Sequence, residues 1–258
     1  MATGMTTATH PAPVHFDLAV GAEFLRYATL LANRGYIQNT LGNIAVRVPL
    51  AGFPDGVAYT KHAGVSLEEM GVENIVITEI GTPRQLFGTR TTSVGHNLNR
   101  EILKLRPDIN AVIHVHDDAS IAFFGAGFTE LKILSADTPF ILGKDPYYLP
   151  GNVNVELDVA PVSNFIQATN LIVLTGHGLT ALGRTLSEAY HRLNSFTAEV
   201  RRNVEAEKLA VITGKTPAYR SRDEIELMHR HADAIINPTR ADNVMRGESA
   251  TPNKAAAE

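Results

Sequence analysis

Hydrophobic residues recur along this chain at two spacings, one typical of helices and the other of strands. Leucine and alanine return every three to four residues from Phe16 to Arg34, and Gly35 follows them as a helix C-cap. The same helical spacing covers residues 94–105, 119–127, 165–169, 186–210 and 222–237. Short β-branched runs predict strands or extended segments at 41–47, 56–60, 75–78, 81–88, 111–116, 131–135, 140–142, 153–157 and 171–174. One helix ends at Arg106-Pro107-Asp108 directly before a strand, which favours an α/β layer structure.

The strand predicted over 111–116 carries two histidines one residue apart. Side chains alternate between the two faces of a strand, so His114 and His116 point the same way. Ala111, Ile113 and Val115 point the other way, into a core. Two adjacent imidazoles can hold a divalent metal, but a pair of half-exposed strand histidines fits the same pattern.

A third histidine follows the apolar run Leu171–Leu174, which predicts a central buried strand. This run ends in Thr175-Gly176-His177-Gly178, where the glycines let the backbone turn sharply. His177 is therefore expected at the end of that strand.

Two turns offer polar groups that can meet a ligand. Gly42-Asn43 lies in a turn before a strand, where glycine allows close backbone approach, although a purely structural turn explains it as well. In Lys61-His62-Ala63-Gly64-Val65-Ser66, Ser66 is expected to cap a short helix over 67–70, with Glu69 in the capping-box position. Backbone N–H groups there can receive an anion that Lys61 neutralises, or Lys61 is simply a solvated lysine.

Composition narrows the function classes. The 258 residues are 44% hydrophobic and 19% charged, with a formal net charge of −4 and no basic cluster, so nucleic acid is not an expected partner. Cysteine is absent, so a metal site must use histidine, carboxylates or solvent. No apolar run has membrane-spanning length and no signal segment is recognised, so we expect a cytoplasmic protein without a membrane partner. We expect flexible tails at 1–15 and 241–258 around a single domain at 16–240.

The order of these motifs resembles the class II aldolase/adducin family: Gly42-Asn43, Ala63-Gly64-Val65, Arg106-Pro107-Asp108, the two-histidine strand and Gly176-His177-Gly178. The resemblance implies a three-layer α/β/α sandwich with a central mixed, largely antiparallel sheet of about nine strands. It also implies a homotetramer with active sites near subunit boundaries. The implied ligands of one divalent metal are His114, His116 and His177. Zinc is the favoured ion, and manganese, cobalt or iron also suit this ligand set.

The chain departs from the family pattern where the aldolases place Ser-Ser-Glu. Those positions fall on Ser93, Val94 and Gly95, so the acid/base glutamate is replaced by glycine. Ala63 stands where a phosphate-binding hydroxyl is expected. A sugar phosphate is therefore disfavoured, and a carboxylate or an aromatic acid is expected. The substrate-binding residues expected from this comparison are Gly42, Asn43, Lys61, His62, Gly64 and Ser93.

His96, beside the missing acid, is the predicted acid/base, because its unperturbed pKa lies near neutrality. The alternative is a solvated residue in the first turn of its helix.

These observations predict a metal-dependent carbon–carbon lyase acting on a small oxo- or hydroxy-acid or an aromatic acid through a metal-chelated enediolate. Both an aldolase and a decarboxylase fit, and the missing glutamate favours the decarboxylase. One alternative is a non-haem iron oxygenase that resembles the prenylphenylpyruvate oxygenase on this fold. A non-catalytic, adducin-like assembly module is disfavoured, because all three histidines are present.

Overall fold

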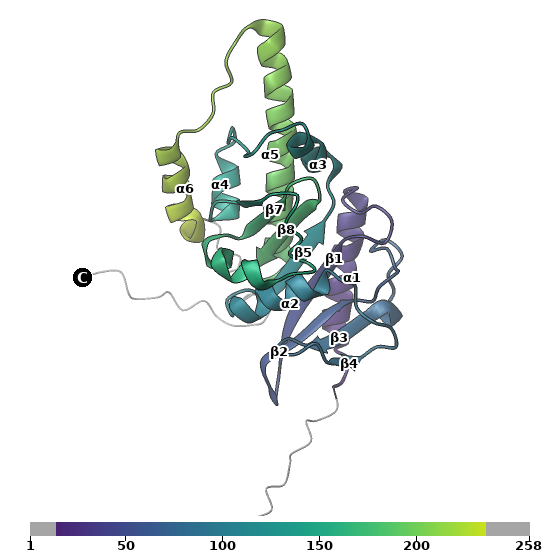
Figure 1. Cartoon of the computed structure of the whole chain (residues 1–258). Helices are drawn as coiled ribbons and strands as arrows, with labels where there is room; N and C mark the ends of the chain where they lie inside the picture. Colours follow the sequence, from purple (N-terminus) through teal and green to yellow (C-terminus); the bar gives the residue numbers. More distant parts are fainter. Residues whose placement is uncertain (1–13, 236–258) are drawn as a thin grey trace, which may run out of the picture.

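The computed structural model describes residues 14–235, which form one sheet covered by helices (Figure 1). Residues 1–13 and the predicted C-terminal tail at 241–258 lie outside the described range. The strands are β1 (Asn43–Leu50), β2 (Phe53–Lys61), β3 (Ile75–Glu79), β4 (Gln85–Phe87), β5 (Ala111–Val115), β6 (Tyr147–Leu149), β7 (Leu171–Leu174) and β8 (Gly178–Gly183). The α-helices are α1 (Leu18–Asn33), α2 (His96–Leu105), α3 (Asp118–Gly125), α4 (Asp137–Leu142), α5 (Leu186–Thr213) and α6 (Arg222–Ile235). Short 3₁₀ helices are η1 (Val72–Asn74), η2 (Ala160–Asn164) and η3 (Ile166–Ala168).

The sheet is mixed and largely antiparallel, as predicted. The order of the strands is β4-β3-β2-β1-β5-β8-β7-β6, and only β6 and β7 run parallel. The described residues contribute eight strands to it, rather than about nine. The apolar strand Leu171–Leu174 is fully buried, but it lies second from one edge and not at the centre.

Helices cover both faces of the sheet, which gives the predicted three layers (Figure 1). Ile113 and Val115 belong to the core shared with α1 and α5, and this confirms the alternation expected for β5. Val112 and Leu182 belong to a second core under α2 and the 3₁₀ helices. Because His114 alternates with Ile113 and Val115, its side chain lies on the α2 face of the sheet.

Several local predictions were wrong. Residues 140–142 lie in α4, because Asp137 and Pro139 favour a first helical turn there. Residues 131–135 and 153–157 form no strand. Strands β6 and β8 were not predicted, since Gly178–Gly183 has little β-propensity of its own and is held by β5 and β7 on either side. Residues 67–70 form a turn and no helix, although the Ser66 backbone N–H donates to Glu69 Oε2 as in a capping box.

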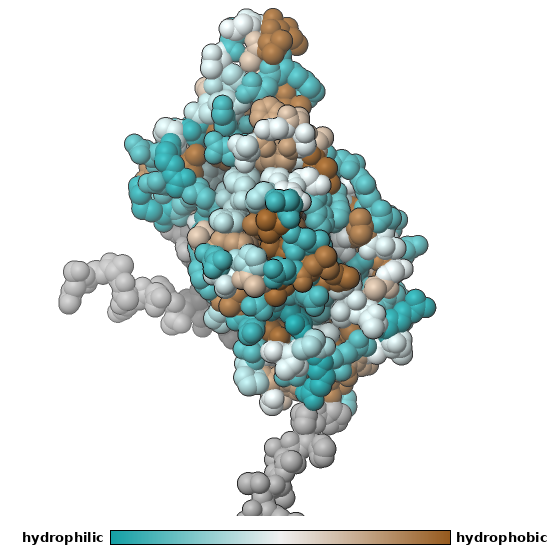
Figure 2. Space-filling view, in the orientation of Figure 1, coloured by the Kyte–Doolittle hydropathy of each residue, from teal (hydrophilic) through white to brown (hydrophobic). Residues whose placement is uncertain are grey.

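Helix α5 is long and extends past the sheet (Figure 1). Its last turns carry the exposed side chains of Leu209, Val211 and Ile212. Figure 2 shows hydrophobic residues at this tip of the molecule. Within residues 14–235, no helix combines the length and apolarity needed to cross a membrane.

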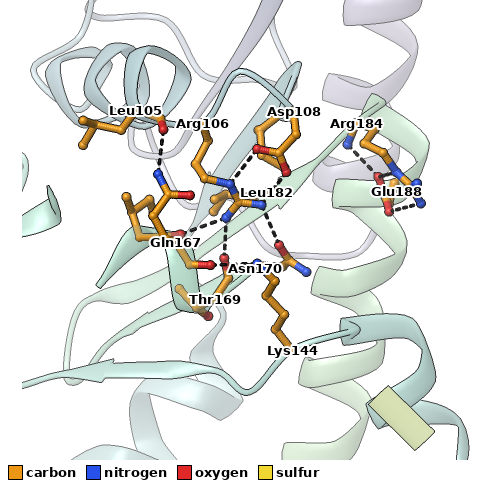
Figure 3. A network of polar contacts seen from close by, with 12 residues as sticks. Leu105, Arg106, Asp108, Lys144, Gln167, Thr169, Asn170, Leu182, Arg184 and Glu188 are labelled. Carbon is orange, nitrogen blue, oxygen red and sulfur yellow. Dashed lines mark hydrogen bonds and ion pairs between the residues drawn. The ribbon is translucent and has the colours of Figure 1, made fainter. Parts of the chain in front are cut away.

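The turn before β5 is fixed by a buried guanidinium. Arg106 donates to the carbonyl oxygens of Ile166 at 2.8 Å and Thr169 at 2.9 Å, and to Asn170 Oδ1 at 3.2 Å (Figure 3). Its Nε and Nη2 each donate to Asp108 over 2.7 Å. The guanidinium therefore joins the segment before β5 to the segment before β7.

Replacing Arg106 with methionine should lower the free energy of unfolding by about 3 kcal/mol, because buried carbonyl groups lose their donor. Urea unfolding followed by circular dichroism measures this. Arg84→Met is the control, because Arg84 forms a half-exposed ion pair with Glu79 and should cost less than about 1 kcal/mol. Equal losses in the two variants would contradict the assigned role of Arg106.

Candidate metal centre

His114 is held in place by the pairing of β5 with β8. In that ladder it stands opposite Thr180, and on the other side it pairs with Asn43 of β1. His114 Nδ1 lies 2.9 Å from Thr180 Oγ1, and both side chains are buried. A proton on Nδ1 that is donated to Thr180 leaves the lone pair of Nε2 free for a metal.

His116 and His177 complete a cluster from two neighbouring turns. His116 directly follows β5, and its backbone N–H donates to the carbonyl oxygen of Tyr36 at 3.1 Å. His177 lies in the turn between β7 and β8, where Gly176 has a φ of 77°. A Cβ at Gly178 would collide with the carbonyl oxygen of Val115, so glycine there allows β8 to begin close against β5.

The three imidazoles converge on one point. One nitrogen of each of His114, His116 and His177 lies within 4.8 Å of the others. The ring centroids are 4.7–5.2 Å apart, with interplanar angles between 70° and 87°. His114 Nε2 and His116 Nε2 are 3.0 Å apart. These edge-on rings present nitrogen lone pairs to a common centre, which is the arrangement that a divalent ion needs.

Burial favours the neutral form of two of these imidazoles, His114 and His116. Burial, together with the neighbouring histidines, lowers the pKa of His114 well below its usual value. Burial and the proximity of His177 lower the pKa of His116 to about 4. Neutral imidazole is the form that binds zinc, manganese, cobalt or iron, so the donor set fits a divalent metal.

A carboxylate that the sequence analysis did not single out lies beside the cluster. Glu156 Oε1 is 3.8 Å from His114 Nε2, and Oε2 is 3.6 Å from His177 Nε2. Burial raises the pKa of Glu156. The residue lies in an irregular loop that Asn154 shapes by accepting the backbone N–H groups of Glu156 and Leu157. Such a loop has no hydrophobic periodicity that would mark Glu156 in the sequence. The only available signal is Gly95, where the family's acid is missing and another segment could supply a carboxylate.

Asn43, one of the predicted substrate-binding residues, lies at the same place, because it pairs with His114 in the ladder between β1 and β5. Asn43 is buried and accepts a hydrogen bond from Asn99 Nδ2 at 2.5 Å, while its own Nδ2 lies close to Gly95. Ser93 Oγ is buried without a hydrogen-bond partner among the described residues. The glycines at 42 and 64 lie in turns with φ of 76° and 80°.

Lys61 and His62 are used inside the protein. Lys61 is fully buried, and its Nζ donates to the carbonyl oxygens of Thr40 and Val65, each at 2.6 Å. Burial lowers the pKa of Lys61 to about 8. The ring nitrogens of His62 lie 2.6 Å from the Ala63 carbonyl oxygen and 2.9 Å from Asn74 Nδ2. The Lys61 contacts join the segments around Thr40 and Val65. Because both side chains already have partners inside the protein, neither is favoured as the main contact for a substrate carboxylate.

His96 is directed away from the three histidines. It is 2% exposed, and its Nε2 lies 2.7 Å from Thr78 Oγ1 on β3, a strand separated from β5 by β2 and β1. Burial lowers the pKa of His96 to about 3, and Arg100 adds to the shift. The acid/base role predicted for His96 receives no support from these surroundings.

Comparison with known proteins and protein families agrees with the family resemblance seen in the sequence. Residues 22–201 match the family model of the class II aldolase and adducin N-terminal domain. The chain belongs to the class II aldolase and adducin family.

Relatives of this family include both enzymes and adducins. The chain is 30% identical over 172 residues to the L-fuculose phosphate aldolase of Methanococcus maripaludis, covering 65% of this chain and 87% of that one. It is 27% identical over 140 residues to gamma-adducin of Mus musculus, covering 54% of this chain but 19% of the adducin. The solved structure of YgbL from Klebsiella pneumoniae superposes with a TM-score of 0.69 at 17% identity, covering 83% and 100% of the two chains. Class II aldolases depend on a metal, and the three histidines offer a site for one.

The burial of His96 predicts a pH-dependent stability of the metal-free protein. The unfolded chain binds a proton at His96 below about pH 6.5, whereas the folded chain resists protonation down to a pKa of about 3. The contribution of neutral His96 to the free energy of unfolding is therefore fully present above pH 6.5, and it is lost as the pH falls towards 3.

Urea unfolding at several pH values tests this. His96→Gln should flatten the dependence between pH 6 and 4 by about 1.4 kcal/mol per pH unit. His191→Gln is the control, because His191 is exposed on α5 and should leave the slope unchanged. A His96→Gln slope equal to that of the wild type would refute the assigned burial.

Proposed function

We propose that this chain is a metal-dependent carbon–carbon lyase of the class II aldolase type that acts on a small oxo- or hydroxy-acid or an aromatic acid. The observation that carries the proposal is the convergence of one ring nitrogen from each of His114, His116 and His177. A divalent ion bound there would act as a Lewis acid and would stabilise the negative charge that develops on substrate oxygens when a carbon–carbon bond breaks. Zinc is the favoured ion, and manganese, cobalt and iron suit the same donors.

The protein's own residues contribute to the proposed mechanism by holding the metal ligands and the substrate in position. The Thr180 hydroxyl fixes the ring of His114, and the sheet fixes its backbone. His177 is a third exposed, so the substrate side of the centre lies towards it. Asn43 Nδ2 and Ser93 Oγ have hydrogen-bonding capacity left for a substrate.

A carboxylic acid suits this site better than a phosphate ester. Two hydroxyl groups expected of a phosphate site are replaced by Ala63 and Val94. The ammonium group of Lys61 is held by two backbone carbonyls and so contributes less to binding an anion. A carboxylate needs fewer donors than a phosphate, and it can bind the metal directly.

The two lyase reactions share their electron balance. In aldol cleavage the substrate hydroxyl gives its proton to solvent water, the carbon–carbon bond breaks and an aldehyde or ketone leaves. In decarboxylation carbon dioxide leaves instead. In both, the electron pair of the broken bond stays on the remaining fragment, delocalised onto oxygen, until a proton is returned to carbon.

A screen of keto and phenolic acids for release of carbon dioxide or an aldehyde tests this proposal. The zinc-loaded protein should turn over at least one acid. His177→Ala should lower kcat/KM at least about 100-fold, because one of three metal ligands is lost. His191→Ala is the matched control on the surface of α5 and should keep full activity. Turnover that does not respond to a chelator would overturn the proposal.

The metal that accompanies the purified protein separates the alternatives. Zinc, manganese or cobalt supports the lyase. Iron together with oxygen uptake in the presence of a 2-oxo or phenolic acid supports an oxygenase on the same fold. A wild-type chain that binds no metal, and that is unchanged by His114→Ala, would favour a non-catalytic, adducin-like role.

We further propose that the chain forms a homotetramer in the cytoplasm, as the family resemblance implies. The apolar end of α5 supports a subunit contact, since Leu209, Val211 and Ile212 are exposed there. Val211 also lines a groove of about 810 Å³ to which residues of α3 and α5 contribute.

Light scattering after gel filtration tests the assembly. The wild type should have about four times the chain mass of 27.9 kDa, and Val211→Asp should reduce it, because burial of a carboxylate in an apolar contact is unfavourable. Lys215→Asp, on the exposed segment after α5, is the control and should leave the mass unchanged. A wild-type mass equal to one chain would contradict the proposed contact.

A further inference from the structure

A glycine and a glutamate from distant parts of the chain share one space next to the three histidines. Gly95 is the N-cap of α2, and Glu156 lies in the loop between β6 and η2. A Cβ built on Gly95 would overlap with both Glu156 Oε1 and Asn43 Nδ2, and it would lie 3.3 Å from Glu156 Cδ. Gly95 has a φ of −60°, which every residue tolerates, so only the neighbouring side chains make the glycine necessary.

The carboxylate of Glu156 is directed at the histidine cluster. One oxygen faces His114 Nε2 at 3.8 Å, and the other faces His177 Nε2 at 3.6 Å. Its side chain is 15% exposed, and no lysine or arginine within residues 14–235 forms an ion pair with it. A carboxylate removed from water in this way needs a cation or hydrogen-bond donors nearby.

The spacing fits a shared metal. Ligand atoms about 2.0–2.2 Å from one ion in a tetrahedral arrangement lie somewhat more than 3 Å from one another. The distances from Glu156 to the two histidine nitrogens are only slightly larger. A divalent ion would also supply the positive charge that the buried carboxylate lacks.

We propose that Glu156 is the fourth protein ligand of the metal, occupying the space that glycine at position 95 leaves open. The family pattern places the acidic group at the start of α2, whereas in this chain the loop after β6 supplies it. This inference rests on the proposed function, since it requires the three histidines to bind a metal.

Competition for zinc with a chromophoric chelator tests the assignment. Glu156→Gln should bind zinc at least about tenfold more weakly than the wild type, because even loss of a partner outside the ligand sphere costs roughly 10- to 100-fold in affinity. Asp158→Asn is the matched control: Asp158 is exposed on the same loop and accepts from the Ala160 backbone N–H, which asparagine also allows. It should bind zinc as the wild type does.

A double-substitution cycle tests the shared space. Gly95→Ala should weaken zinc binding by pushing the carboxylate aside, whereas adding Gly95→Ala to Glu156→Ala should change the affinity much less, because only the contact with the Asn43 amide then remains. Additive losses would contradict the proposal, since they would assign the effect of Gly95→Ala to something other than Glu156.

Two further measurements separate a ligand from a structural residue. The visible absorption of bound Co²⁺ should change in Glu156→Gln, because this spectrum reports the ligands and their geometry. The metal-free Glu156→Gln protein should be at least as stable to urea as the wild type, because a buried, unpaired carboxylate is removed.

Failure of the inference is distinguishable from failure of the proposed function. Wild-type zinc affinity and an unchanged Co²⁺ spectrum in Glu156→Gln would overturn the role of Glu156 alone. A wild-type chain without stoichiometric zinc binding would overturn both.

Discussion

The antiparallel pairing of β5 with β8 is the constraint on which the site depends. It places Thr180 opposite His114, so one hydroxyl fixes the ring that lies deepest in the cluster. It also brings the turn that carries His177 to the end of β5, since β8 begins directly after that turn. Gly178 permits this approach, because a side chain there would collide with the Val115 carbonyl. A change in the register of this pair would separate the three imidazoles.

Burial has opposite consequences for the different polar groups around this ladder. It keeps His114 and His116 neutral by lowering their pKa values, which prepares them for a metal. It raises the pKa of Glu156, whose charge is unfavourable until a cation is near. Lys61 meets the same cost by donating to two backbone carbonyls, and so it stabilises the turns instead of facing a ligand. The electrostatics of the metal-free protein therefore favour binding of a cation where the imidazoles and the carboxylate meet.

Periodicity predicted the parts of the fold that follow local rules. The alternation in Ala111–Val115 correctly placed Ile113 in a core, and the helical spacing located α1 and α5. Strand β8 was missed because its pairing partners, and not its own residues, determine its conformation. The surroundings of His96 were also missed, because α2 packs its first turn against β3 through Thr78, a contact that sequence spacing does not reveal.

Only part of the site could be predicted from the sequence, because local patterns do not reveal contacts between distant segments. Neighbouring histidines on one strand are visible in the sequence, whereas the convergence of His177 with them was expected only from the family resemblance. Glu156 lies in a loop shaped by an asparagine side chain, and no pattern of hydrophobic positions marks it. Gly95 indicated that the family's acid is missing from this position. Only the packing of two distant segments showed that the Glu156 carboxylate lies next to it.

X-ray absorption of the zinc-loaded protein tests the central claim most directly, because it counts the ligands of the bound ion. We expect one zinc per chain with three imidazole nitrogens at about 2.0–2.1 Å, and fewer in each of the single alanine variants of His114, His116 and His177. A wild-type spectrum with fewer than three imidazoles, or one that these substitutions leave unchanged, would contradict it.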